Sequence, residues 1–216
     1  MKQKPYQNTL KLMKDVTSKK KRIVNFLGYK LIINKKVFPV DSDFSLSSKI
    51  IAKQIPKNPG KVLDIGTGTG VQAIIAAKKG AKKVIAADIE KDALKNAKEN
   101  KKFHKLKNIE IRKSNLFSNI KKNEKFNLII ANLPFEDVSE KRFKNFLFDP
   151  DYKLHEKFLK KAKDHLLPNG KILISSGDIA NEEKLLELIK KYNYKILKVK
   201  QEKFNNLIWK VYILRL

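Results

Sequence analysis

Cysteine is absent from the 216 residues of the chain, and histidine occurs only three times. A chain without thiols has no disulfide framework, thiolate zinc site or cysteine nucleophile, and the scattered histidines predict no metal site. No apolar run of about 18 residues is present, and the first residues lack the apolar block of a secretory signal. These absences predict a soluble, cytoplasmic protein that does not associate with membranes.

Acidic residues and arginine are also scarce. The chain carries 49 Lys and Arg against 22 Asp and Glu, which gives a net charge of +27, and only four of the cations are Arg. An excess of positive charge favours contact with RNA or the ribosome. Nucleic-acid sites also favour Arg, however, and lysines spread along the whole chain equally indicate biased residue usage. The charge alone leaves both interpretations open.

The hydrophobic share of 42% is enough for one sizeable core. Residues 1–36 are polar and basic and predict an N-terminal arm with a short helix near residues 10–16 and a hairpin that turns at residues 34–36. Residues 37–216 form the main domain, which begins with a helix over residues 44–55.

Strand-length apolar runs alternate with amphipathic stretches beyond residue 60. Strands are predicted at residues 61–65, 83–88, 109–112, 126–131 and 171–175, and helices at residues 71–79, 91–102, 151–167 and 181–192. This alternation predicts an α/β fold with a mostly parallel sheet and helices on both faces. Residues 194–203 and 207–214 lie too close together for a crossover and predict an antiparallel C-terminal hairpin.

A glycine-rich turn follows the first of these strands in the sequence VLDIGTGTG, residues 62–70. The spacing is G-x-G-x-G, with Val71 where a dinucleotide site places its third glycine. Asp64 near the turn suits a ligand with a positive amino group, and Asp88 at the end of the next strand suits the two hydroxyls of a ribose. The alternative role for Asp88 is to cap the following helix. Together, Asp64 and Asp88 indicate a ligand that consists of an amino acid joined to a nucleoside.

VLDIGTGTG followed by AADIE resembles motifs I and II of the class I S-adenosylmethionine-dependent methyltransferases, over roughly residues 37–216. The resemblance implies a Rossmann-like, seven-stranded sheet with a reversed last strand, and S-adenosyl-L-methionine as cofactor. It also implies cofactor roles for particular residues: the methionine part, the ribose and the adenine would contact Asp64, Gly66, Thr67, Gly68, Gly70, Asp88, Ile89, Asn115 and Leu116.

Asn132, Leu133, Pro134 and Phe135 follow the strand at residues 126–131, at the same sheet edge as the glycine turn. The Asn132 side-chain oxygen and the Leu133 carbonyl can accept two N–H bonds from a planar nitrogen, which directs its lone pair toward a methyl group. Pro134 restricts the backbone there, and Phe135 can stack on a planar substrate. The tetrapeptide resembles the N-P-P-Y/F signature of methyltransferases that act on planar nitrogens, with Leu133 as the departure.

The stretch VFPVDSDF, residues 37–44, resembles the segment upstream of motif I in glutamine methyltransferases and their small-domain relatives. That resemblance implies substrate contacts by Asp43 and Phe44; the alternative is a proline turn with an Asp helix cap. His155 and His165 are predicted on the partly exposed side of a helix. Three aromatic residues are candidates for a lid, core packing or an RNA stacking surface: Phe143, Phe146 and Phe148.

These features predict an N-methyltransferase that acts on a macromolecule. A protein glutamine is slightly favoured by residues 39–44, and an adenine or guanine of rRNA or tRNA is the alternative that the charge favours. A non-catalytic RNA-binding factor on the same fold is a further alternative. Neither the acceptor atom nor the oligomeric state follows from the sequence.

Overall fold

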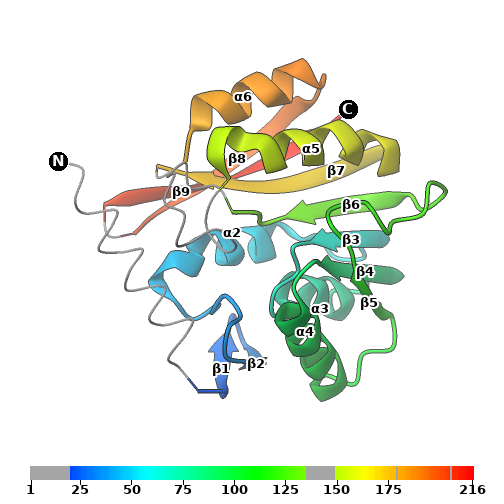
Figure 1. The fold of residues 1–216 in the computed structure, drawn as a ribbon, viewed down its shortest axis with the longest axis vertical. Helices are drawn as coiled ribbons and strands as arrows, with labels where there is room; N and C mark the ends of the chain where they lie inside the picture. The colour runs from blue at the N-terminus through cyan, green and yellow to red at the C-terminus, as the bar shows by residue number, and fades with distance from the viewer. Residues whose placement is uncertain (1–19, 135–148, 179, 205) are drawn as a thin grey trace.

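A seven-stranded sheet forms the centre of the computed structural model, which describes residues 20–134, 149–178, 180–204 and 206–216 (Figure 1). The strand order is β5-β4-β3-β6-β7-β9-β8, in which β9 runs antiparallel to both neighbours and the other pairs are parallel. The bounds of the strands are β3 Lys61–Ile65, β4 Lys83–Asp88, β5 Ile109–Lys113, β6 Phe126–Ala131, β7 Leu166–Gly177, β8 Lys195–Phe204 and β9 Leu207–Arg215.

Helices cover both faces of the sheet, as Figure 1 shows. On one face α2 contacts α3 and α3 contacts α4, and on the other α5 contacts α6. Their bounds are α2 Leu46–Gln54, α3 Val71–Lys78, α4 Lys91–Phe103, α5 Lys153–Ala162 and α6 Glu182–Lys191, with short 3-10 turns at Asp43–Ser45, Pro150–Tyr152 and Lys163–His165. The predicted α/β class, parallel sheet and reversed C-terminal strand are confirmed.

The central strands are buried on both faces, which explains why they appear in the sequence as unbroken apolar runs. Val62 and Leu63 on β3 and Ile129 and Ile130 on β6 have no exposed surface. Within the described residues, no helix is long and apolar enough to span a membrane.

The N-terminal hairpin differs from the prediction. Strand β1 (Arg22–Phe26) pairs with β2 (Tyr29–Ile33), so the hairpin turns at Leu27 and Gly28, and the predicted turn at residues 34–36 lies after its second strand. Both turn residues have positive φ, 51° and 85°. Gly adopts this conformation readily, but Leu rarely does, so Leu27 in the sequence does not indicate a turn. The predicted helix near residues 10–16 lies outside the described residues, and the domain boundary between residues 36 and 37 stays a prediction.

Two buried asparagines attach this hairpin to α4. The backbone N–H of Ile32 donates to Asn100 Oδ1 at 2.7 Å, and the Asn100 amide donates to the carbonyls of Ile32 and Thr69 at 2.7 and 2.9 Å. Asn96 accepts from the Asn34 N–H at 2.8 Å in the same way. Because Asn100 bonds both segments, the hairpin and the glycine turn are held in one arrangement.

The helix predicted over residues 151–167 is present but ends earlier, and the prediction for two histidines was wrong. Helix α5 ends at Ala162 and β7 begins at Leu166, so the Pro168-Asn169-Gly170 sequence lies within the span of β7, where its register against β6 shifts. His155 has no exposed surface and its Nδ1 lies 2.7 Å from Asp149 Oδ2. His165 is 6% exposed, and its ring stacks on that of Phe117 in the interior.

Candidate functional site

The glycine turn leads directly from β3 into α3 and forms the floor of a cavity. Gly66, Gly68 and Gly70 all have positive φ, at 70°, 54° and 83°. A Cβ on Gly70 would lie 3.1 Å from the Cβ of Ala97 on α4, whereas a Cβ on Gly68 would meet no atom of the described residues within 4 Å. Gly70 therefore permits helix packing, and Gly68 leaves open space beside the cavity that it lines.

Asp64 lies on β3 beneath this turn and is 1% exposed. Its Oδ2 accepts hydrogen bonds from Thr67 Oγ1 at 2.6 Å and from the Ala73 N–H at 3.2 Å. Burial raises the pKa of the Asp64 carboxyl from 3.8 to about 7, an effect that these two hydrogen bonds oppose and the charge of Asp88 adds to. A positive ligand group beside Asp64 would favour its ionised form.

Asp88 ends β4 and faces the same cavity. Its Oδ2 accepts from the Gly68 N–H at 2.9 Å and its Oδ1 from the Glu90 N–H at 3.0 Å, so it holds the glycine turn and the start of α4 together. Burial raises the pKa of the Asp88 carboxyl above its usual value. Each carboxylate oxygen has a further lone pair for a hydroxyl donor. Ile89, which also lines the cavity, is 50% exposed.

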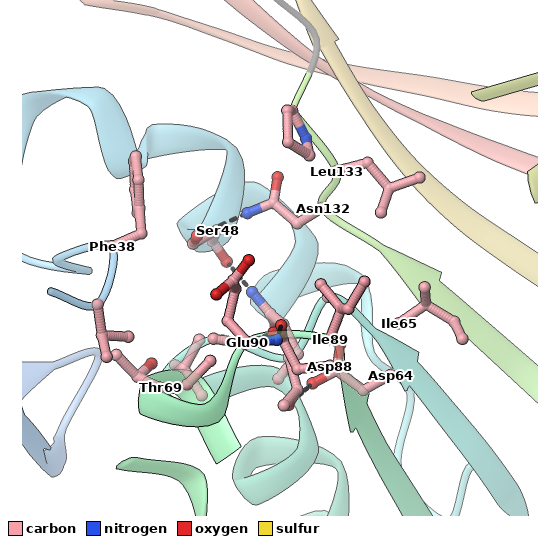
Figure 2. A pocket seen from close by; sticks show the side chains of 18 of the residues that line it. Phe38, Ser48, Asp64, Ile65, Thr69, Asp88, Ile89, Glu90, Asn132 and Leu133 are labelled. Atoms are coloured by element: carbon pink, nitrogen blue, oxygen red, sulfur yellow. Dashed lines mark hydrogen bonds between the residues drawn. The ribbon is translucent and has the colours of Figure 1, made fainter. Parts of the chain in front are cut away.

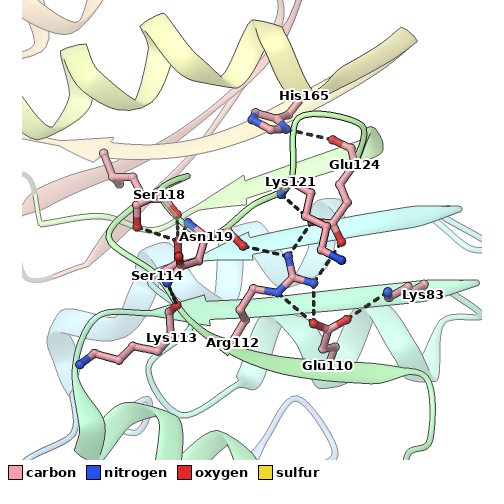
Figure 3. A network of polar contacts seen from close by, with 11 residues as sticks. Lys83, Glu110, Arg112, Lys113, Ser114, Ser118, Asn119, Lys121, Glu124 and His165 are labelled. Atoms are coloured by element: carbon pink, nitrogen blue, oxygen red, sulfur yellow. Dashed lines mark hydrogen bonds and ion pairs between the residues drawn. The ribbon is translucent and has the colours of Figure 1, made fainter.

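Asn115 and Leu116 line the cavity from the loop after β5. Ser114 Oγ donates to the Leu116 carbonyl at 2.7 Å, and Ser118 Oγ accepts from the Asn115 N–H at 3.0 Å. Figure 3 shows the rest of this network, in which Arg112 bonds the Asn119 carbonyl at 3.0 Å and the carboxylates of Glu110 and Glu124. The guanidinium therefore fixes the loop that carries Asn115 and Leu116.

Asn132, Leu133 and Pro134 follow β6 at the edge where β3 and β4 end, and all three line the cavity (Figure 2). The Asn132 amide donates from Nδ2 to Ser48 Oγ on α2 at 2.9 Å. Figure 2 shows the Asn132 oxygen turned away from Ser48. The structure thus brings this part of the predicted tetrapeptide together with the predicted cofactor residues. Phe135 lies outside the described residues, as do Phe143, Phe146 and Phe148.

The upstream segment approaches the cavity through different residues from those predicted. Val37, Phe38 and Val40 line it, whereas Asp43 is exposed and is not among the lining residues. Nothing is described of the Phe44 side chain. Arg22 forms a two-point ion pair with Asp41, at 2.7 and 3.0 Å, which ties β1 to this segment.

Several lining residues were missed by sequence reasoning. Thr69 Oγ1 and Gln72 Oε1 are buried at the cavity and have no hydrogen-bond partner among the described residues, while the Gln72 amide donates to the Ser48 carbonyl at 2.9 Å. Ser47 on α2 and Trp209 on β9 complete the upper wall. Thr69 belongs to the glycine motif and could have been found there; the contribution of α2 and β9 depends on tertiary folding alone.

The residues present fit a ligand that joins an amino acid to a nucleoside. Unpartnered oxygens on Thr69 and Gln72, with the Asp64 carboxyl, provide acceptors at the glycine turn, where an ammonium group needs them. Asp88 adds an acceptor pair next to the exposed apolar side chain of Ile89, which suits a ribose beside a flat base. The fit agrees with the order of the parts of S-adenosylmethionine.

Residues 28–205 match the family model "Methyltransferase small domain". The chain belongs to this family. It is 32% identical over 181 residues to a candidate protein N5-glutamine methyltransferase of Methanocaldococcus jannaschii, covering 81% of this chain and 89% of that protein. It is 35% identical to a ribosomal protein L11 methyltransferase of Lactobacillus johnsonii, covering 67% and 39%, and 36% identical to a release factor glutamine methyltransferase of Shewanella oneidensis, covering 59% and 50%. The chain thus spans at most half the length of the last two.

Solved structures share the fold. A tRNA m1G37 methyltransferase of M. jannaschii superposes with a TM-score of 0.68 at 22% identity, over 92% of this chain and 57% of that one. A candidate methyltransferase complexed with S-adenosylhomocysteine gives a TM-score of 0.70 at 16% identity, over 92% and 57%. The protein is therefore an S-adenosylmethionine-dependent methyltransferase with a Rossmann-like sheet.

Proposed function

We propose that this enzyme methylates the side-chain amide nitrogen of a protein glutamine. The observation that supports this most strongly is the placement of Asn132 and Leu133 at the cavity, with the Asn132 oxygen directed away from its partner Ser48. Two of the relatives are named as glutamine methyltransferases, and both are more than 30% identical to this chain.

An amide nitrogen is a weak nucleophile because its lone pair is delocalised into the carbonyl. In the proposed reaction Asn132 Oδ1 and the Leu133 carbonyl accept hydrogen bonds from the two N–H groups of the amide. These bonds hold the nitrogen so that its lone pair can attack the methyl group. Pro134 fixes its own φ and restricts Leu133 to an extended backbone. Phe135 is proposed to stack on the flat amide. The acceptor loses its proton after the methyl group is transferred, so no strong base is needed.

The cofactor roles are proposed from the same cavity. When bound, S-adenosylmethionine supplies an electrophilic methyl group on a positively charged sulfur. Asp64 and the turn from Gly66 through Thr67 and Gly68 to Gly70 would hold its amino-acid part, and Asp88 its ribose hydroxyls. Ile89 and Leu116 would pack against the adenine, and Asn115 would accept from the adenine amino group. Asp43 and Phe44 remain proposals for contact with the macromolecular substrate.

An RNA base is the second candidate acceptor, because an adenine or guanine amino group is also planar and the chain carries a net charge of +27. The two candidates differ in what carries the methyl group. Purified enzyme is therefore incubated with labelled S-adenosylmethionine and a cell extract, with or without ribonuclease. The proposal predicts label that survives ribonuclease, disappears with protease, and yields N5-methylglutamine on hydrolysis.

The Asn132→Ala variant is the control in that experiment, since background label from extract enzymes persists with it and specific label does not. Loss of the specific label after ribonuclease, with N-methylated adenine or guanine in the digest, contradicts the glutamine proposal and supports the RNA alternative.

A further inference from the structure

A second, shallow groove lies at the end of α4 that is remote from the cavity. Seven lysines line it, together with Leu106, Asn108 and the first three residues of β5, which are Ile109, Glu110 and Ile111. The lysines are Lys82, Lys83, Lys98, Lys101, Lys102, Lys105 and Lys107. Glu90 and Ala93, at the start of α4, line the cavity instead. The groove and the cavity therefore lie toward opposite ends of α4, whose 13 residues span about 20 Å. We call these seven residues the lysine groove.

The lysines follow the outer side of the helix. The inner side of α4 buries Ala93, Leu94, Asn96, Ala97 and Asn100, which face the sheet and the N-terminal hairpin. Lys98, Lys101 and Lys102 occupy the other side and continue into the turn after the helix. The partial negative charge of the α4 C-terminus stabilises these cations in the free protein.

Acidic residues neutralise little of this charge. Lys83 lies 3.0 Å from Glu110, but the same carboxylate also accepts from Arg112. Within the described residues, no carboxylate lies within 4 Å of the ammonium groups of the other six lysines. The nearby Glu99 is paired with Lys21 at 2.8 Å. Among the described residues Glu110 is the one acid that lines the lysine groove, which is therefore a concentrated positive surface with little internal counter-charge.

The chemistry of the groove suits a phosphate backbone. Lysine is a flexible point charge that contacts phosphates without a fixed geometry, and contacts of this kind position a nucleic acid without reading its sequence. Among the described residues, the side chains that line the groove include no aromatic ring, which favours contact with the phosphate backbone over stacking of bases. The three apolar residues that line it give an acidic protein little to pack against.

We propose that the lysine groove binds the phosphate backbone of RNA, and that it holds the enzyme on an RNA-containing particle while the cavity acts elsewhere on that particle. This goes beyond the proposed function and does not depend on it, because a protein or an RNA acceptor is compatible with the same attachment. It also assigns RNA binding to particular residues, which the net charge of the whole chain cannot do.

The test compares two triple variants with equal changes in charge. The groove variant is K98E/K101E/K105E, and the control is K157E/K160E/K190E, three exposed lysines of α5 and α6. Fluorescence anisotropy of a labelled RNA hairpin is measured from 50 to 200 mM KCl without cofactor. We expect the groove variant to lose at least tenfold in affinity at 100 mM KCl, with the salt slope reduced by about 2, and the control to lose less than threefold.

Thermal unfolding and calorimetry with S-adenosylhomocysteine establish that the groove variant is folded, and K98Q/K101Q/K105Q repeats the test without introduced acids. Equal losses in the groove and control variants would overturn the proposal and leave the charge as residue usage. Poly-glutamate that displaces the hairpin at equal charge concentration would also overturn it, in favour of an acidic protein partner. Cofactor binding is read separately, so failure here leaves the proposed methyl transfer untouched.

Discussion

The side-chain amide of Asn132 donates a 2.9 Å hydrogen bond to Ser48 Oγ, which joins the end of β6 to α2 across the top of the cavity. Because Nδ2 is engaged as the donor, Oδ1 is left as the acceptor (Figure 2). Ser48 is itself 3% exposed, whereas Asn132 is only partly buried at the cavity. Ser48 is a positioning residue in this account, since it determines which end of the amide meets the substrate.

Ser48→Ala is expected to reduce kcat by about threefold to tenfold, the value of one hydrogen bond, with little change in KM. The amide can then rotate and present its NH₂ group to the acceptor nitrogen. Ser48→Thr keeps the hydroxyl and is expected to retain most of the rate. Steady-state kinetics of the three proteins checks this, and an alanine variant with a wild-type kcat would remove Ser48 from the account.

The glycine turn provides a matched pair of substitutions. Gly70→Ala places a methyl group 3.1 Å from Ala97 at φ 83°, and we expect it to reduce the free energy of unfolding by about 1–3 kcal/mol. Gly68→Ala meets no atom, so it is expected to cost about 1 kcal/mol for its positive φ alone. Affinity for S-adenosylhomocysteine should fall most in Gly68→Ala, because its methyl group borders the cavity. Urea unfolding and calorimetry separate the two effects, and a reversed order in stability would contradict the packing argument.

The raised pKa of Asp64 leads us to expect opposite pH trends for stability and for cofactor binding. Its pKa of about 7 in the folded protein exceeds the ordinary 3.8, so its contribution to stability is present at acid pH and is lost as pH rises toward 7. A ligand with a positive amino group prefers the ionised form, so affinity for S-adenosylhomocysteine should be roughly tenfold higher at pH 8 than at pH 6. Asp64→Asn should weaken both trends and leave the part that is due to Asp88, whose carboxyl pKa is also raised by burial. Equal affinities of the wild-type protein at the two pH values would contradict the role of Asp64.

The pairing of Arg112 with Glu124 is expected to affect how the stability of the protein changes at acid pH. Its hydrogen bonds lower the pKa of Glu124 to about 2 from 4.5, so this pairing stabilises the fold above pH 4.5 and is lost as pH falls toward 2. Arg112→Gln should lower the unfolding temperature at pH 7 and flatten its decline between pH 5 and pH 3. Lys184→Gln, which breaks an exposed pair with Glu187, is the control and should change little. The same decline in both variants would show that Arg112 is not responsible.

Much of this fold is predictable because strand β3, the glycine turn and Asp88 follow local rules of burial and turn chemistry. The alternation of apolar runs and amphipathic stretches likewise specifies the parallel sheet. The hairpin at Leu27 was missed because its turn includes a non-glycine residue with positive φ. Its second strand is also held at Ile32 by the asparagines of α4, which lie 64–68 positions away in the sequence. Ser48, Gln72 and Trp209 reach the cavity only after the chain has folded, so no local pattern indicates them.

The central claim is that Asn132 directs the transfer of a methyl group and is not needed for binding the cofactor. The most direct test measures S-adenosylhomocysteine affinity by calorimetry and label transfer from S-adenosylmethionine for the wild-type enzyme and Asn132→Ala. We expect the variant to bind the cofactor within about threefold of wild type and to lose at least 100-fold in transfer. Undiminished transfer by Asn132→Ala, or failure of the wild-type protein to bind S-adenosylhomocysteine, would contradict it.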